Sequence, residues 1–389
     1  MKNWIILFKK LMIFTMTEKN IIPYVRVDEQ GKEEIESLEQ IFRNIVTSGK
    51  YVGGEAVDNL EAELAEYIGV KEVVTLNSGT DALMFSLVCA GVKRGDEVIT
   101  APNSFIASAA SIAHIGAVPV FADVDDDQNI CPERIAEKVT SKTKAIMPIH
   151  LTGRPCQMDP IMDIADKAGA AVIEDAAQSI GTLYQGQKTG SIGHYGCFSA
   201  HPLKNLNAIG DGGYVATNNS SAAAEMRKLR NHGLVNRITS ERWGFVSRMD
   251  ALQAAILSYR LTRLEDVIQK RRHNAGRYHK LLNRDHVFMP EERPEQFNTY
   301  HTFVIQVERR DELQAHLAEQ GIKTSIHYPK PIHLQPAAAY LGHQLGDFPK
   351  TEEQAQRILT LPVNQNMTDD ELVRVADCVN AFYSTNGPN

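Results

Sequence analysis

Hydrophobic residues follow two alternating spacings along this chain, one typical of helices and the other typical of buried strands. At 32–48 and 55–67 the apolar residues recur every three to four positions, which predicts two amphipathic helices. The short β-branched run at 72–76 predicts a buried strand. The same reasoning predicts strands at 96–101, 118–122, 144–150, 169–175 and 214–217, and helices at 82–90, 105–115 and 159–168. Strands that alternate with helices indicate an α/β fold with a mostly parallel sheet.

The remaining part of the chain predicts a long helix and a smaller unit beyond it. A polar, aperiodic stretch at 231–242, which we expect to be a mobile loop, precedes an amphipathic helix at 247–283. Ser247 and Asp250 form a capping-box arrangement at the start of that helix. Strands are then predicted at 301–307 and 323–328, and helices at 311–320 and 369–383.

These elements predict two domains after an N-terminal segment. Residues 1–15 are apolar but interrupted by Lys9 and Lys10, too short to span a bilayer, and followed by no small-residue cleavage site. We therefore expect a disordered arm or an extension from a doubtful start site. A large domain is predicted at 16–260 and a small C-terminal domain at 261–389, joined through the long helix.

The net charge and the cysteine pattern argue against several kinds of binding partner and bound group. The chain has 389 residues, with 41 basic and 48 acidic side chains, so its formal charge of −7 argues against a general attraction to nucleic acid or to anionic membranes. The five cysteines are scattered, and none forms a CxxC pair. This pattern favours a reducing cytoplasm and argues against disulfides and a metal cluster.

Polar residues follow several predicted strands, at the edge where ligands bind to sheets of this kind. Ser78, Gly79 and Thr80 lie between a strand and a helix, where free amides and a close backbone could hold a phosphate. A plain helix cap explains the same residues equally well. Asp175 ends an apolar strand, where a carboxylate is costly unless it caps the next segment or contacts a cation such as a protonated pyridine nitrogen.

Lys204 lies in an unusually constrained setting for a lysine. Pro202 precedes it, Asn205 follows it, and Gly210, Gly212 and Gly213 form a tight turn shortly afterwards. In isolation, a solvated loop lysine is the simpler interpretation. The alternative is an amine that its surroundings desolvate, so that it is neutral near pH 7 and can form a Schiff base.

Together these motifs resemble the sugar aminotransferases of the DegT/DnrJ/EryC1/StrS family, over nearly all of 22–383. The markers are Ser-Gly-Thr-Asp-Ala at 78–82, Val-Ile-Glu-Asp-Ala-Ala-Gln at 172–178, Phe-Ser-Ala-His-Pro-Leu-Lys-Asn at 198–205 with Gly-Asp-Gly-Gly at 210–213, Arg-Met-Asp-Ala-Leu-Gln at 248–253, and Ile-His-Tyr-Pro at 326–329. The resemblance implies the type I fold of pyridoxal-phosphate transferases. That fold has a large domain with a mostly parallel, mixed seven-stranded sheet between helices, and a smaller C-terminal α/β domain.

The resemblance also implies a role for each matching residue. Lys204 matches the catalytic lysine that carries pyridoxal 5'-phosphate, and Asp175 matches the acid on the pyridine nitrogen. Gln178 matches the residue that binds the phenolic oxygen, and the phosphate cradle matches Ser78, Gly79, Thr80 and Ser199. Phe105 matches the residue that stacks on the ring, although without the family a buried core phenylalanine would be the better interpretation.

The family forms homodimers whose active sites lie at the subunit interface. The partner subunit completes each phosphate site from a segment that matches 245–248, which points to Arg248, with a structural salt bridge as the alternative. Many members carry asparagine where Val246 stands here, so this sequence departs from the pattern. His327 and Tyr328 match a motif at the acceptor-sugar side, although a histidine at a strand end can equally be a packed or capping residue.

The resemblance implies transfer of an amino group from L-glutamate to a keto-sugar, with pyridoxamine 5'-phosphate as the intermediate form of the cofactor. The expected acceptor is a nucleotide-linked keto-hexose for cell-surface polysaccharide or lipopolysaccharide. A free eight-carbon sugar acid is an alternative acceptor. A sugar dehydratase is disfavoured because it would replace Lys204 by histidine, and a catalytically silent regulator is disfavoured because it should have lost Lys204 or Asp175.

Overall fold

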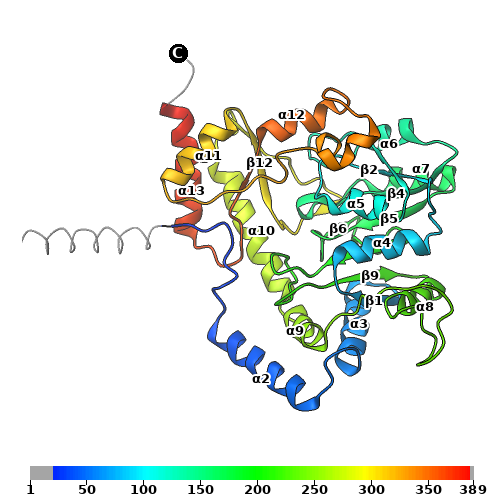
Figure 1. Cartoon of the computed structure of the whole chain (residues 1–389). Helices are drawn as coiled ribbons and strands as arrows, with labels where there is room; N and C mark the ends of the chain where they lie inside the picture. The colour runs from blue at the N-terminus through cyan, green and yellow to red at the C-terminus, as the bar shows by residue number, and fades with distance from the viewer. Residues whose placement is uncertain (1–20, 386–389) are drawn as a thin grey trace, which may run out of the picture.

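A computed structural model describes residues 21–385 of the chain, so the predicted N-terminal arm at 1–15 lies outside the described residues. A mixed seven-stranded sheet forms its centre (Figure 1). The strand order is β1-β9-β8-β5-β4-β2-β3, and only β9 runs antiparallel to its neighbours. The strands are β1 (Glu72–Leu76), β2 (Glu97–Thr100), β3 (Val118–Phe121), β4 (Thr143–Met147), β5 (Ala171–Asp175), β8 (Tyr195–Ser199) and β9 (Gly213–Thr217). The fold class predicted from the sequence is confirmed.

Helices cover both faces of this sheet because successive strand residues point to opposite sides. Val73 packs with α3 (Glu55–Ile68) and α9 (Ala251–Leu261). Val74 packs on the other face with α4 (Gly79–Cys89) and α8 (Ser220–Leu229). The large domain also contains α5 (Ala107–His114), α6 (Pro132–Lys138) and α7 (Met158–Ala168).

The C-terminal unit is a small antiparallel sheet with helices packed against it. Strand β12 (Phe303–Val307) lies between β10 (Val287–Phe288) and β13 (Ile358–Leu361). Ile22 is buried in the same core and forms a bridge with Ile322, so the start of the described chain packs on this unit. The surrounding helices are α10 (Leu264–Leu281), α11 (Arg310–Glu319), α12 (Pro349–Arg357) and α13 (Asp369–Thr385). The domain boundary between residues 260 and 261 stays a prediction.

The long helix predicted at 247–283 is wrong in its continuity. The structure has two helices, α9 and α10, separated at Thr262 and Arg263. The Thr262 hydroxyl donates to the Tyr259 carbonyl at 2.8 Å, and the Arg263 amide donates to the Arg260 carbonyl at 3.0 Å, which is a tighter turn than an α-helix makes. The apolar spacing runs through this break because both helices pack on the same core.

Two further predictions in this part of the chain need correction. The strand predicted at 323–328 does not form, since only Ser325 makes a bridge, to Thr360 of β13. Prolines at 329 and 331 follow at once and cannot donate a hydrogen bond to a sheet. The predicted capping box is also absent, because the Ser247 hydroxyl donates to Asp81 at 2.6 Å and the Asp250 side chain makes no cap bond.

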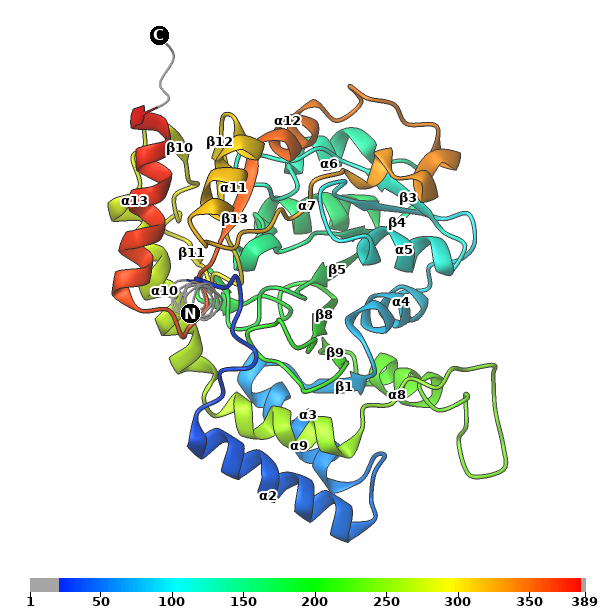
Figure 2. The ribbon, with the colours of Figure 1, turned by 60° about the vertical axis from the view of Figure 1, so that its left-hand side comes forward.

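Three further features complete the fold. Helix α2 (Lys32–Ser48) follows one edge of the molecule beside α9, and none of its residues is buried (Figures 1 and 2). The stretch 231–246 projects beyond α8 as a long loop (Figure 2), and its mobility stays a prediction. A hairpin of β6 (Leu183–Tyr184) and β7 (Gln187–Lys188) pairs with β11 (Gln296–Phe297). Among the described residues, no helix is long and apolar enough to cross a membrane.

Candidate active site

A cavity of about 390 Å³ lies where the carboxyl ends of the central strands meet the C-terminal unit. Ten of the eleven residues predicted for the site line it, namely Ser78, Gly79, Thr80, Phe105, Asp175, Gln178, Ser199, Lys204, His327 and Tyr328. Arg248 does not line it in this chain. Its side chain is exposed and donates to Asn231 Oδ1 at 3.3 Å.

Lys204 is held in a turn after β8, where its amide donates to the His201 carbonyl at 2.8 Å. Burial lowers the pKa of its amine to about 8, although the nearby charge of Asp175 acts in the opposite direction. An amine with this pKa is neutral in a useful fraction of molecules near neutral pH, which a nucleophilic lysine requires. This environment does not fit the ordinary solvated lysine considered from the sequence.

Asp175 ends β5 and is 6% exposed. Its Oδ2 accepts a hydrogen bond from Ser108 Oγ at 2.8 Å, and its Oδ1 accepts one from the Ala177 amide at 3.2 Å. Burial raises the pKa of this carboxyl, and the two donors and the Lys204 charge oppose that rise. The carboxylate therefore caps the following turn, as the simpler interpretation proposed, and also borders the cavity.

The start of α4 forms the far wall of the cavity. Ser78 is the N-cap residue, and its side chain accepts from the Asp81 amide at 3.1 Å. Amides in the first turn of a helix lack intrahelical partners and attract anions. Gly79 is needed for close approach, since a Cβ there would lie 2.9 Å from the Ser199 Cβ on β8. The two elements together make a small, amide-rich end to the cavity.

Another part of the cavity wall is formed by the side-chain amide of Gln178 and the rings of Phe105 and Tyr328. Gln178 Oε1 accepts from the Thr152 amide at 2.8 Å, and its Nε2 donates to the Tyr328 hydroxyl at 3.4 Å. Phe105 is 56% exposed, and its ring centroid lies 5.9 Å from that of Tyr328. Phe105 is therefore not a buried core residue and presents its ring to the cavity.

His327 and Tyr328 keep their uncharged forms at neutral pH. Burial, reinforced by the charge of Lys204, lowers the pKa of His327 to about 4. Burial and the charge of Asp175 raise the pKa of Tyr328 to about 12. His327 Nδ1 lies 2.9 Å from Thr360 Oγ1, which fixes the ring against β13. Both side chains can serve as neutral hydrogen-bonding groups for a ligand.

A family model confirms the resemblance seen in the motifs. The model of the DegT/DnrJ/EryC1/StrS aminotransferase family matches residues 30–380. The chain belongs to this family.

Relatives within the family carry both enzymatic and regulatory names. A pleiotropic regulatory protein of Geobacillus stearothermophilus is 39% identical over 93% of this chain and 98% of its own length. The dTDP-3-amino-3,6-dideoxy-alpha-D-galactopyranose transaminase of Aneurinibacillus thermoaerophilus is 38% identical over 93% of this chain and 99% of its own.

Solved structures of family members share the fold over almost the whole chain. DesV of S. venezuelae, crystallised with a ketimine intermediate, has a TM-score of 0.91 at 34% identity and covers 93% of this chain and 98% of its own. NtdA of Bacillus subtilis, with bound cofactor PMP, has a TM-score of 0.86 at 31% identity and covers 92% of this chain and 84% of its own.

No sequence motif singled out several other residues that line this cavity. Ser108 lines it and bonds Asp175, and Ser104, one helical turn earlier, lies 2.7 Å from Ser108. The repeat of serines four residues apart could have revealed this pair. His301 also lines the cavity, and burial together with the charges of Lys204 and Arg271 lowers its pKa well below the usual value. No spacing pattern marked His301.

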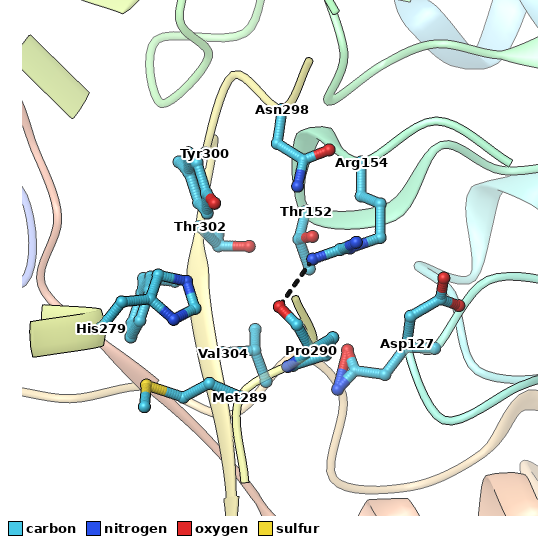
Figure 3. A pocket seen from close by; sticks show the side chains of 12 residues that line it. Asp127, Thr152, Arg154, His279, Met289, Pro290, Asn298, Tyr300, Thr302 and Val304 are labelled. Atoms are coloured by element: carbon cyan, nitrogen blue, oxygen red, sulfur yellow. Dashed lines mark hydrogen bonds between the residues drawn. The ribbon is translucent and has the colours of Figure 1, made fainter. Parts of the chain in front are cut away.

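A second hollow lies between the loops that follow β3 and β4 and the region of β12 (Figure 3). Its volume is about 30 Å³, which is room for about one water molecule. Figure 3 shows Arg154 extending across it toward the Pro290 carbonyl, to which Nη2 donates at 2.9 Å. Side-chain atoms of Asn298 and Thr302 lack protein partners there, which fits bound water. Lys204 does not line this hollow, so it is not the substrate site.

Proposed function

We propose that this protein transfers the amino group of L-glutamate to a keto-sugar with pyridoxal 5'-phosphate as cofactor. The observation that carries the proposal is a desolvated lysine, Lys204, in one cavity with a buried carboxylate and a helix N-terminus. Membership of an aminotransferase family and sugar-transaminase relatives support sugar transamination. We further propose that L-glutamate is the donor and that a nucleotide-linked keto-hexose is the acceptor. In this proposal the product is used for cell-surface polysaccharide or lipopolysaccharide, and the protein acts in the cytoplasm.

The residues present fit the cofactor along its whole length. Its phosphate would be held by the amide-rich end at Ser78, Gly79, Thr80 and Ser199, where a Cβ at 79 would close the space. At the opposite end, the buried Asp175 carboxylate needs a positive partner, which a protonated ring nitrogen supplies. Between these ends, we propose that Gln178 donates to the phenolic oxygen of the cofactor and that Phe105 stacks against its ring.

Each of these side chains then has a physical task. When bound, the cofactor supplies an electron sink for the carbon that gains or loses the amine. Lys204 Nζ, with a pKa of about 8, can both hold and release a proton beside that carbon. Asp175 keeps the ring nitrogen protonated by its negative charge, and Ser108 holds the carboxylate in place. His327 and Tyr328 bind the sugar as neutral partners.

We also propose that the active protein is a homodimer. Helix α2 and the segment after it carry large apolar side chains that are about half exposed, including Ile35, Phe42 and Tyr51. An apolar surface of this kind is typical of an interface. Arg248 does not line the cavity of its own chain, so in this proposal it completes the phosphate site of the partner subunit.

One specific observation keeps a second candidate function in view. The relative in Geobacillus stearothermophilus carries the name of a regulatory protein. A regulator without catalysis would not need an amine with a pKa of about 8 facing a buried carboxylate. Both groups are present here, and Lys204 is not replaced by histidine as in the dehydratases, although His201 also lines the cavity. Catalysis by transamination is the better proposal.

A direct test uses the lysine and then the acceptor. Borohydride reduction of the purified protein should attach the cofactor to the peptide that contains Lys204, seen by mass spectrometry. Lys204→Ala should lose this attachment, whereas Lys167→Ala, which changes an exposed lysine on α7, should keep it. Attachment in Lys204→Ala, or none in the wild type, would refute the proposal.

The acceptor is tested separately. The cofactor-bound protein is first converted to its amino form with L-glutamate, and nucleotide-linked keto-hexoses are then compared with a free eight-carbon sugar aldehyde acid. Return of the original absorption spectrum identifies the acceptor. Return with the free sugar acid alone would replace the nucleotide-linked acceptor by the alternative.

A further inference from the structure

A second large cavity, of about 250 Å³, shares Lys204 with the active-site cavity. It lies between the first described residues of the chain, α10 and the stretch 364–366. The cofactor roles proposed above use none of its other residues. A cavity that reaches the same lysine from another side is placed to hold a part of a substrate.

Arg271 of α10 lines this cavity and is only 6% exposed. Its Nε donates to Gln365 Oε1 at 3.2 Å, and its Nη1 donates to the carbonyls of Tyr300 and His301 at 3.4 and 3.0 Å. All three partners are neutral, and within residues 21–385 Nη2 makes no hydrogen bond. A buried guanidinium usually has a carboxylate partner, because an uncompensated buried charge is strongly unfavourable.

The acids around this cavity are already paired with other cations. Glu34 lies 2.8 Å from Arg260, Asp266 lies 2.8 Å from Lys270, and Glu29 lies 3.5 Å from Arg26. Arg271 and Arg263, which also line the cavity, have no carboxylate partner among the described residues. The cavity is therefore short of negative charge, and an anionic ligand would supply it.

The position of Arg271 favours one kind of anion. His301 accepts from Arg271 through its carbonyl, and its ring is close enough to Lys204 for that charge to affect its titration. Both cations therefore lie near His301, and both line the same cavity. In an amino acid, a carboxylate is one bond from the carbon that bears the reacting amine. In a nucleotide-linked sugar, the phosphates are separated from the ketone by the sugar ring.

We propose that Arg271 binds a carboxylate of the amino-acid donor through its unpaired Nη2. The proposal rests on the proposed function, because it assumes that an amino acid reacts at Lys204. Arg271 then acts as a substrate-binding residue that holds the donor by the carboxylate next to its amine, and Gln365 holds the guanidinium in place.

The test measures binding of glutarate, a dicarboxylate that cannot be transaminated, to the cofactor-bound protein by calorimetry. Arg271→Met should weaken glutarate binding at least tenfold, because it removes a charge-assisted hydrogen bond. Arg272→Met is the matched control: it removes the next arginine of α10, which bonds Glu292 and stacks 3.9 Å from the Phe297 ring, outside the cavity. Glutarate binding by this control should stay within twofold of the wild type.

Arg271→Lys controls for a loss of binding that is caused by misfolding, because it keeps the positive charge that faces the two carbonyls. It should fold, with a melting temperature close to that of the control, and still bind glutarate at least threefold more weakly than the wild type, because lysine lacks the planar fork. Unchanged glutarate binding in Arg271→Lys and Arg271→Met would overturn the proposal, and so would a wild type that does not bind glutarate.

Inorganic phosphate is the second probe and separates two sources of the anion. Loss of phosphate binding with unchanged glutarate binding in Arg271→Met would assign the cavity to the phosphates of the sugar substrate and overturn the proposal. Failure of the proposed function is distinguishable, because it would show as a wild type without borohydride attachment at Lys204, whatever the glutarate result.

Discussion

Gly79 offers a sharp test of the phosphate cradle, because its role is steric rather than conformational. Its φ is not in the left-handed region, and alanine would ordinarily suit the first turn of a helix. A Cβ at this position would lie 2.9 Å from Ser199 Cβ, 3.3 Å from Ser199 Cα and 3.4 Å from the Phe198 carbonyl oxygen. Two of these atoms belong to the backbone of β8, so α4 and β8 must move apart to admit a methyl group.

Overpacking of this kind costs about 1–3 kcal/mol, which corresponds to about 1–4 °C in melting temperature for a chain of 389 residues. Gly79→Ala should therefore melt earlier than the wild type. It should also bind pyridoxal phosphate at least tenfold more weakly, because the same movement separates the helix amides from Ser199. Absorbance titration of the apo protein and thermal denaturation with and without the cofactor measure the two effects.

Gly276→Ala provides the matched control. Gly276 lies inside α10, and a Cβ there would meet nothing within 4 Å. This variant should gain about 0.5–1 kcal/mol of stability, because alanine favours a helix over glycine, and its cofactor affinity should not change. Wild-type cofactor affinity in Gly79→Ala would refute the placement of the phosphate at α4.

Three further outcomes follow from the site and the surface. Attachment of pyridoxal phosphate to the apo protein should accelerate as the pH rises through about 8 and level off above it, because the neutral amine of Lys204 reacts and its pKa is about 8. A rate that falls over this range would contradict the lowered pKa. Ser108→Ala should raise the pKa of Asp175 further, because it removes the hydroxyl that donates to the carboxylate at 2.8 Å, and should shift the acidic limb of the pH–rate profile to higher pH. The control is Ser111→Ala, which removes a hydroxyl that donates to the Ser108 carbonyl and should leave that limb in place. Phe42→Glu should shift the protein toward monomers in sedimentation, because it places a charge on the apolar face of α2; an unchanged dimer would exclude that face from the interface.

The sequence predicted the sheet well because its signals are local. Buried parallel strands carry short apolar runs, such as residues 170–173 in and beside β5, which a glycine precedes and two acidic residues follow. The break between α9 and α10 could not be predicted in this way, since Thr262 interrupts the helix through its own hydroxyl while the apolar spacing continues. The strand β13 was not predicted because its four residues, Ile-Leu-Thr-Leu directly after a helix, are too few to show a distinctive pattern.

The candidate site divides in the same way. Residues at strand ends, such as Asp175, are placed by the topology of the sheet, so a sequence that reveals the strands also reveals them. His301 and Arg271 enter from the C-terminal unit, and their positions depend on how that unit packs against the large sheet. No local pattern carries that information. The residues proposed for the cofactor were therefore accessible from the sequence, whereas the residue proposed for the donor carboxylate was not.

Asp175 and Lys204 show why burial, rather than either residue alone, prepares this site for chemistry. Burial raises the pKa of the carboxyl and lowers the pKa of the amine, so each group is pushed toward its neutral form, while the charge of each opposes the shift in the other. Burial and the attraction between the two charges therefore act in opposite directions on both groups. In the proposed function, a cofactor that brought a protonated nitrogen to Asp175 and bonded to the amine of Lys204 would relieve both burial costs at once. In that proposal, the same two residues would serve both cofactor binding and proton transfer.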